Sequence, residues 1–172
     1  MHALSAPFFC GFLMRLRSLA FVVCLTLITG CDAEPSSPEA DLIRDQLRAA
    51  DYAQTFARAP GWESPRQPEA GGAHGPFIDI YINSVVADAL AGEDALDRWP
   101  DGALIVKDGW DDAEGEVHLY FAFMERRPEG WFWGEYRGDG SLVAAGVDEP
   151  RCANCHSAGQ DSVFAFRLPT GR

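Results

Sequence analysis

The sequence predicts an α+β fold, mainly an antiparallel β-sheet with flanking helices. Much of the chain after residue 76 consists of short segments rich in β-branched and aromatic residues, separated by turns that contain Gly and Asp. Apolar residues recur at helical spacing over residues 41–57. The 172 residues, of which 47% are hydrophobic and 23% charged, have the composition of a globular domain of average size.

The expected elements follow one another in a simple order. One or two helices are expected over residues 41–57, and the prolines and glycines of residues 59–76 indicate a loop. A short helix is expected at residues 85–91 and a turn at residues 99–102. Strands are expected over residues 77–83, 103–108, 116–125, 131–137 and 161–166.

The first thirty residues have the pattern of an export signal. They contain no acidic residue, and two arginines, Arg15 and Arg17, precede an apolar run over residues 19–28. The segment Leu27-Ile28-Thr29-Gly30-Cys31 resembles the lipobox of bacterial lipoproteins, in which the cysteine is acylated and becomes the first residue of the mature chain. A plain signal peptide with an incidental cysteine is the alternative interpretation.

These features divide the chain into three parts. Residues 1–30 are the predicted lipoprotein signal peptide, residues 31–40 a flexible tether rich in Pro, Ser and Glu, and residues 41–172 a single domain. Met14 is an alternative start, because the two arginines and the apolar run follow it directly. The sequence therefore predicts an exported protein, held on the periplasmic side of a bacterial membrane by a lipid on Cys31.

The charge balance bears on the partners of the protein. The chain has 14 basic and 26 acidic residues, a net charge of −12, which disfavours nucleic acid because phosphate binding requires a basic surface. Acidic residues are dense over residues 93–116. This run is interpreted as a solvated face; the alternative is that it orients a basic redox partner protein.

The segment Cys152-Ala153-Asn154-Cys155-His156 carries the strongest functional signal in the chain. Two cysteines with a two-residue spacer and an adjacent histidine form the attachment signature of a c-type haem. The two thiols add across the two vinyl groups at one edge of the porphyrin, and the histidine ligates the iron. The sequence therefore predicts a covalent haem c near the C-terminus, held by Cys152 and Cys155, with His156 on the iron.

Three other interpretations of the two cysteines were considered. A zinc site needs two more ligands, and besides His156 the mature chain offers only His74 and His118. A thioredoxin-type redox pair is expected within an alternating pattern of strands and helices, which this sequence lacks. A structural disulfide would not require the adjacent histidine.

The second axial position of the iron is expected to be open. No methionine follows the motif, whereas a later methionine ligates the iron in small helical cytochromes c. Met124 is interpreted as a core residue, His118 as exposed or hydrogen-bonded, and His74 lies in the glycine-rich loop. Open haem iron binds small ligands or carries out chemistry, whereas six-coordinate haem usually transfers electrons.

Three sequence blocks carry a resemblance to a known family. They are Ile80-Tyr81-Ile82-Asn83, the turn Trp99-Pro100-Asp101-Gly102 leading into a strand that ends Val106-Lys107-Asp108, and the haem motif followed by Asp161-Ser162-Val163-Phe164. Through these blocks the chain resembles the cytochrome P-460 family and its relative cytochrome c′-beta. The resemblance implies an antiparallel sheet with flanking helices, a proximal histidine, an open distal pocket and often a homodimer.

The resemblance also implies a role for Lys107, the only lysine of the chain. In P-460 members a lysine side chain is covalently tied to the porphyrin rim, and these proteins oxidise hydroxylamine or convert nitric oxide. Lys107 aligns with that lysine, and an amine can lose its proton where a guanidinium cannot. The alternative is a snorkelling or salt-bridged lysine on a strand.

The distal residues implied by the resemblance differ from the P-460 pattern. Phe121 takes the place of the distal glutamate, and Phe121 and Phe123 are predicted to wall an apolar pocket, as in the cytochrome c′-beta members that bind nitric oxide without the lysine link. Glu125 and Asp79 are the nearby acids. A pocket without a placed base is expected to bind nitric oxide but to oxidise hydroxylamine poorly.

Three functional hypotheses follow. The first is a haem oxidoreductase acting on hydroxylamine or nitric oxide, with His156 as proximal ligand. The second is a module that binds nitric oxide without turnover. The third is an electron-transfer cytochrome whose iron is closed by His118, His74 or Met124.

Overall fold

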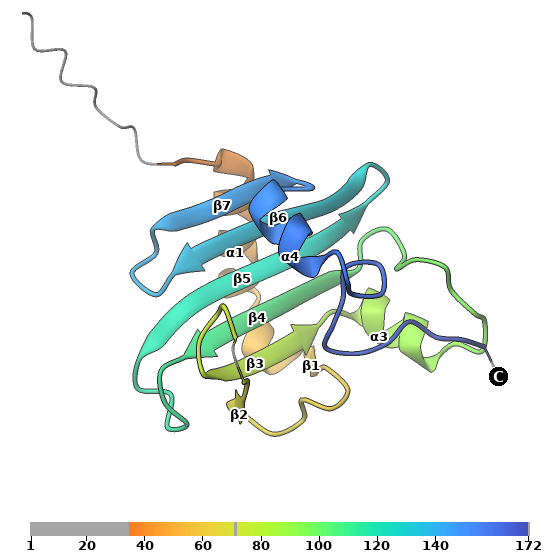
Figure 1. Cartoon of the computed structure of the whole chain (residues 1–172), viewed down its shortest axis with the longest axis horizontal. Helices are drawn as coiled ribbons and strands as arrows, with labels where there is room; N and C mark the ends of the chain where they lie inside the picture. The colour runs from red at the N-terminus through yellow and green to blue at the C-terminus, as the bar shows by residue number, and fades with distance from the viewer. Residues whose placement is uncertain (1–34, 71, 172) are drawn as a thin grey trace, which may run out of the picture. The chain divides into compact units, whose positions relative to one another are not determined.

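An antiparallel sheet forms the body of the protein in the computed structural model (Figure 1). Within residues 35–70 and 72–171, which are the residues that the structure describes, the sheet has seven strands in the order β1-β3-β4-β5-β6-β7, and β2 also pairs with β3. The strands are β1 (Ala57–Arg58), β2 (Gln67–Pro68), β3 (Phe77–Ile82), β4 (Leu104–Trp110), β5 (His118–Arg127), β6 (Gly130–Arg137) and β7 (Leu142–Val147). The prediction of an α+β fold is confirmed.

The predicted leader at residues 1–30, the alternative start Met14 and the predicted lipid site Cys31 lie outside the described residues. Across the part of the chain that is described, no helix combines the length and apolar character needed to cross a membrane. The described helices are α1 (Pro38–Ala49), α2 (Tyr52–Thr55), α3 (Ser84–Ala91) and α4 (Pro150–His156).

The two faces of the sheet carry separate cores. Successive side chains of a strand point to opposite faces, so each strand supplies both. Figure 1 shows α1 behind the sheet and α4 in front of it. Leu47 of α1 packs with Val106, Phe121 and Tyr136 on one face. On the other face the core residues are Ile80, Ile105, Met124, Trp131 and Trp133, and Cys152 of α4 packs against them.

Helix α1 begins inside the segment predicted as a tether. The Ser37 side chain accepts a hydrogen bond from the backbone N–H of Ala40 at 3.3 Å, and Pro38 occupies the first turn. Both residues are typical of a helix start, because Ser satisfies a free N–H and Pro has none to satisfy. The boundary predicted at residue 40 was therefore wrong by one helical turn.

Most of the predicted elements agree with the structure, but the strand predicted at residues 161–166 was wrong, and β7, α4 and the two-residue strands β1 and β2 were not predicted. Strand β7 was not predicted, because three of its six residues are Ala or Gly, which have low strand propensity. Its pairing with β6 holds it extended. The strand predicted at residues 161–166 does not form. Asp161 and Ser162 have φ angles of 45° and 65°, so the chain turns there instead of extending.

Candidate functional site

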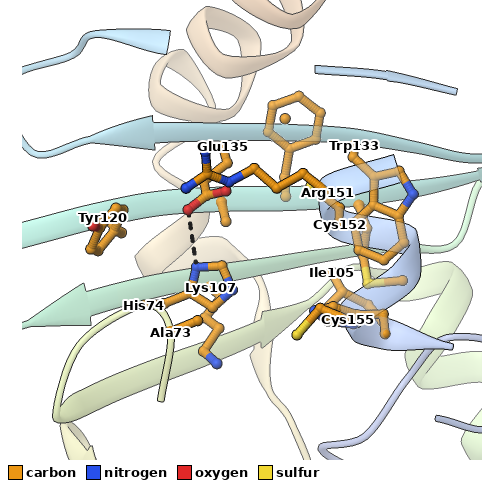
Figure 2. Close-up of a pocket in the computed structure, with 15 residues that line it drawn as sticks. Ala73, His74, Ile105, Lys107, Tyr120, Trp133, Glu135, Arg151, Cys152 and Cys155 are labelled. Atoms are coloured by element: carbon orange, nitrogen blue, oxygen red, sulfur yellow. Dashed lines mark ion pairs between the residues drawn. The ribbon is translucent and has the colours of Figure 1, made fainter. Parts of the chain in front are cut away.

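A pocket lies on the face of the sheet that α4 covers (Figure 2). Strands β4, β5 and β6 form its floor, α4 forms one side, and residues 73–74 from the loop before β3 form another. The floor is mostly apolar, with Ile105, Ala122, Met124 and Trp133 facing the cavity. An apolar cavity with a few charged groups at its edge is the usual form of a small-molecule or cofactor site.

Helix α4 brings the whole predicted attachment motif to this pocket. Cys152, Cys155 and His156 all line it, and both cysteines are free thiols. The two cysteines are three residues apart on a helix, so their side chains lie on one face. Pro150 in the first turn fixes the start of α4, and the Glu149 side chain accepts a hydrogen bond from Arg151 N at 3.4 Å.

The ring of His156 is held in one orientation. Its Nδ1 lies 2.8 Å from the carbonyl oxygen of Ser162, which only accepts hydrogen bonds, so Nδ1 donates and Nε2 keeps its lone pair. Burial lowers the pKa of His156 and favours the neutral ring. A neutral imidazole whose second nitrogen is anchored by a carbonyl is the usual form of a metal-ligating histidine. The turn at Asp161 and Ser162 places that carbonyl.

The free thiols, the neutral His156 and the apolar pocket are compatible with a c-type haem, and two of the three alternatives fit the described residues less well. Burial, with the nearby Glu135 and Glu149 charges, raises the pKa of Cys152 to about 12, whereas thioredoxin-type cysteines have lowered pKa values. The sheet is antiparallel throughout the described residues, unlike the fold expected for that motif. Among those residues no group of three or more His, Cys, Asp or Glu side chains is arranged to hold a metal ion.

Lys107 also lines the pocket, at its edge. Its Nζ lies 2.9 Å from both carboxylate oxygens of Glu69, so the side chain forms an ion pair in this structure. This is the geometry of the salt-bridged alternative. Glu69 comes from the loop between β2 and β3, and the pair ties that loop to β4.

The predicted distal wall is wrong for Phe121. Phe121 is 1% exposed and packs against Tyr52 and Tyr136 on the face covered by α1. Because side chains alternate along β5, positions 120, 122 and 124 face the pocket instead. Phe123 belongs to the same core as Phe121, but it packs across Gly134 and also contributes to the edge of the pocket.

Neither of the acids considered from the sequence lies in the pocket. Glu125 shares the face of Phe121 and Phe123 and forms an ion pair with Arg127 at 2.7 Å. Asp79 lies on that face as well, 2% exposed. Neither Glu125 nor Asp79 is therefore placed to act on a ligand bound in the pocket.

The acid that does line the pocket is Glu135, which sequence reasoning missed. It lies on β6, two residues from Trp133 on the same face, and is 7% exposed. Burial raises the pKa of Glu135, although the positive charges of Arg151 and Arg137 oppose this effect. The alternation of Trp131, Trp133 and Glu135 along a predicted strand was the signal that could have found it.

His74 stands next to Glu135 in the pocket. Its Nδ1 lies 3.7 Å from Glu135 Oε1, and this buried nitrogen has no hydrogen-bond partner among the described residues. Burial, together with the Lys107 and His156 charges, lowers the pKa of His74 to about 3. The ring is therefore neutral at physiological pH, and its contact with Glu135 is not an ion pair.

A glycine on β4 makes the position of His74 possible. A Cβ built on Gly109 would lie 1.6 Å from the carbonyl oxygen of His74, so the loop can approach only because that side chain is absent. We expect Gly109→Ala to destabilise the protein by about 1–3 kcal/mol, the usual cost of overpacking. Urea unfolding measures this cost. Gly92→Ala at the end of α3, where φ is −65°, is the control, and an equal effect of both changes would contradict the explanation.

Of the three candidates for a second axial ligand, two line the pocket and one does not. His74 and Met124 line the pocket. His118 does not: its Nε2 lies 3.0 Å from Asp108 Oδ1 on the opposite face, which confirms the prediction of a hydrogen-bonded side chain.

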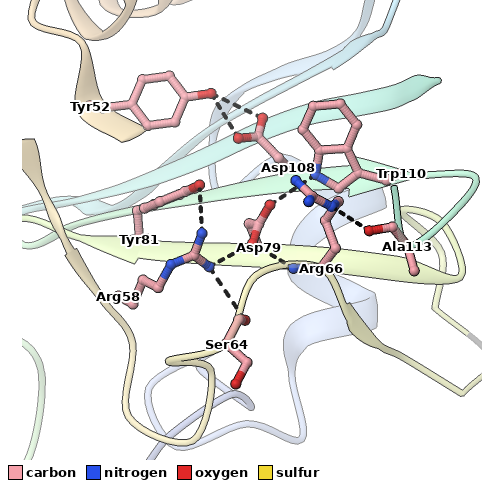
Figure 3. Close-up of polar contacts among 9 residues, drawn as sticks. All are labelled: Tyr52, Arg58, Ser64, Arg66, Asp79, Tyr81, Asp108, Trp110 and Ala113. Atoms are coloured by element: carbon pink, nitrogen blue, oxygen red, sulfur yellow. Dashed lines mark hydrogen bonds and ion pairs between the residues drawn. The ribbon is translucent and has the colours of Figure 1, made fainter. Parts of the chain in front are cut away.

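A second polar cluster lies on the face covered by α1 (Figure 3). Asp79 accepts hydrogen bonds from Arg58 Nη1 at 2.6 Å, from the Arg66 backbone N–H at 2.8 Å and from Trp110 Nε1 at 3.0 Å. The neighbouring Asp108 accepts one from the Tyr52 hydroxyl at 2.9 Å. These bonds fasten α2 and residues 57–66 to the sheet, and we interpret the cluster as structural.

Comparisons with family models, with curated proteins and with solved structures found no significant match to this chain.

Proposed function

We propose that this chain is an exported c-type haem protein of the cytochrome P-460 type, acting on hydroxylamine or nitric oxide. The observation that carries the proposal is the convergence of Cys152, Cys155 and His156 on one apolar pocket, with Nε2 of His156 left free to bind iron. The thiols of Cys152 and Cys155 would hold the haem. When bound, the haem supplies an iron centre that takes small nitrogen ligands and exchanges electrons with a redox partner protein.

Glu135 supplies the base function in this proposal. Oxidation of hydroxylamine requires protons to leave its nitrogen and oxygen, and a buried carboxylate is suited to accept them. Burial raises the pKa of Glu135 and so brings it closer to neutrality. Glu135 is therefore the proposed base, at a position that the sequence did not indicate.

Lys107 has a different role in the proposal. Its amine stands at the edge of the pocket, and Glu69 is in place to accept its proton. The family resemblance makes Lys107 the candidate for a covalent link to the haem. The absorption spectrum of the reduced holoprotein reports on this point: a broad, red-shifted Soret band supports the link, and an ordinary c-type spectrum leaves Lys107 paired with Glu69.

The test of the proposal is hydroxylamine turnover by the holoprotein with an added electron acceptor. We expect Glu135→Gln to lower kcat by about 10²–10⁴-fold, the usual contribution of a positioned base, with the haem content unchanged. Glu125→Gln is the matched control, because Glu125 lies on the other face of the sheet, and it is expected to retain activity. Equal activity of wild type and Glu135→Gln would contradict the role of Glu135.

A module that binds nitric oxide without turnover is the second candidate, favoured by the apolar floor of the pocket. Binding of nitric oxide by a holoprotein that does not oxidise hydroxylamine would select it. The electron-transfer alternative now rests on His74 and Met124 alone. Immediate carbon monoxide binding to the reduced iron would exclude it.

A further inference from the structure

Two tryptophans of β6 form a line that begins at the predicted iron ligand. Trp133 meets His156 edge-on, with ring centroids 4.8 Å apart and an interplanar angle of 62°. Trp131 lies two residues earlier on the same face of β6, with its ring centroid 6.3 Å from that of Trp133. Both indoles are nearly inaccessible to solvent, with exposures of 2% for Trp131 and 4% for Trp133.

We propose that Trp133 and Trp131 carry single electrons between the haem site and the start of β6, and that Trp131 is the residue that holds the oxidised state. This inference rests on the proposed function, because it requires a haem on His156. Indoles and phenols are among the side chains that are most readily oxidised by one electron, and direct contact between rings makes electron transfer over these distances fast.

The hydrogen bonds of the two indoles differ, and this difference decides which of the two holds the oxidised state. Trp133 Nε1 is buried and has no hydrogen-bond partner among the described residues. Trp131 Nε1 donates to Asp161, at 3.0 Å to the carbonyl oxygen and 3.3 Å to Oδ1. An oxidised indole is strongly acidic at Nε1, so it is stabilised where a carboxylate can take the proton. Asp161 offers this acceptor to Trp131 alone.

Arg126 reinforces the difference. Its guanidinium carbon lies 5.8 Å from the ring centroid of Trp131, and its Nε is 3.5 Å from Asp161 Oδ2. A positive charge this close disfavours an indole cation radical and favours the neutral radical that remains after the proton leaves. Oxidised Trp131 is therefore expected in its neutral, deprotonated form.

The reaction chosen to oxidise Trp131 starts from the ferrous holoprotein and one equivalent of hydrogen peroxide. The O–O bond breaks and two water molecules form, which takes two electrons and two protons. The ferrous iron gives one electron and becomes ferric, and Trp131 gives the other through Trp133. One proton comes from Trp131 Nε1 by way of Asp161 Oδ1, and the other comes from solvent.

The test is electron paramagnetic resonance of this mixture after rapid freezing, with indole-deuterated tryptophan to identify the radical. We expect a neutral tryptophan radical in the wild type and its loss in Trp131→Phe and in Trp133→Phe. The chain has five tryptophans, and Trp62→Phe, a loop residue outside this line, is the control that should retain the signal. A radical that survives in Trp131→Phe would overturn the proposal.

Asp161→Asn provides a variant that leaves both indoles in place. It retains the side-chain shape but removes the proton acceptor, so we expect the neutral radical to be lost. An unchanged neutral radical in Asp161→Asn would also overturn the proposal. The haem content of every sample is measured first: a wild type without haem refutes the proposed function and this inference together, whereas a haem-loaded wild type that reacts with peroxide but gives no tryptophan radical refutes this inference alone.

Discussion

Replacement of both Cys152 and Cys155 by serine is expected to abolish covalent haem attachment completely, when the chain is exported in a host that has the haem-maturation machinery. Serine keeps the size of the side chain but supplies no thiol, and the thioether bonds need sulfur. The measurement is the mass of the denatured chain, together with the haem absorbance that remains with the protein after denaturation. The wild type is expected to show the added mass of haem and to keep its haem absorbance after denaturation.

Asn154→Ala is the matched control for the two serine substitutions. Asn154 lies between the two cysteines on α4 and is exposed, so its replacement leaves the thiols and the helix in place. This variant is expected to carry haem like the wild type. Covalent haem on the doubly substituted chain, or its absence from the wild type, would refute the assignment of the motif.

Asp79→Ala is expected to lower the free energy of unfolding by about 3–5 kcal/mol, the cost of removing one partner of a buried ion pair. The substitution leaves the Arg58 guanidinium without its carboxylate and deprives Arg66 N–H and Trp110 Nε1–H of their acceptor. Each of these partly buried donors then loses its acceptor, and an unsatisfied donor costs about 1–3 kcal/mol. Urea unfolding of the same chain with and without the change measures the effect.

Two further variants serve as comparisons: one removes an exposed carboxylate elsewhere, and the other removes only the charge of Asp79. Asp94→Ala, at an exposed position near the end of α3, is expected to change stability by less than about 0.5 kcal/mol. Asp79→Asn keeps the shape of the side chain but loses the charge, and is expected to fall between Asp79→Ala and the wild type. A loss in Asp79→Ala no larger than that in Asp94→Ala would show that the cluster does not hold the sheet.

The elements that the sequence predicted well are those whose local signals agree with their packing. Strand β3 alternates β-branched and aromatic residues, and Asn83 directly after it is a favourable helix start. Its side chain accepts a hydrogen bond from Val86 N at 3.2 Å at the start of α3. Here residues adjacent in sequence decide the structure, so a sequence pattern is sufficient.

The errors came from features that depend on distant residues. Strand β7 is held by pairing with β6 rather than by its own propensity, and the turn at Asp161 is fixed by hydrogen bonds to Trp99 and Trp131. The distal residues failed for a related reason. A shift of one residue along β5 moves every side chain to the other face, and only the position of α4 decides which face holds the pocket.

The position of Glu135 changes the balance between the two leading hypotheses. With Phe121 and Phe123 as the pocket walls, the sequence predicted a pocket that binds nitric oxide but oxidises hydroxylamine poorly, which weakened the oxidoreductase hypothesis without replacing it. The structure places a buried carboxyl in the pocket and puts Phe121 behind the sheet. In the proposed function this carboxyl is the candidate base, which a catalyst needs and a carrier does not.

The order of elements along the chain bears on how such a protein would mature. All the strands of the described sheet precede α4, so the strands leave the ribosome or an export channel before Cys152 and Cys155 do. The strands that form the floor of the pocket are therefore present before the thiols are, although the domain folds as a unit. In the proposed function, the enzyme that attaches haem would have to reach Cys152 and Cys155 before α4 packs on the sheet and the Ser162 carbonyl accepts the hydrogen bond from His156.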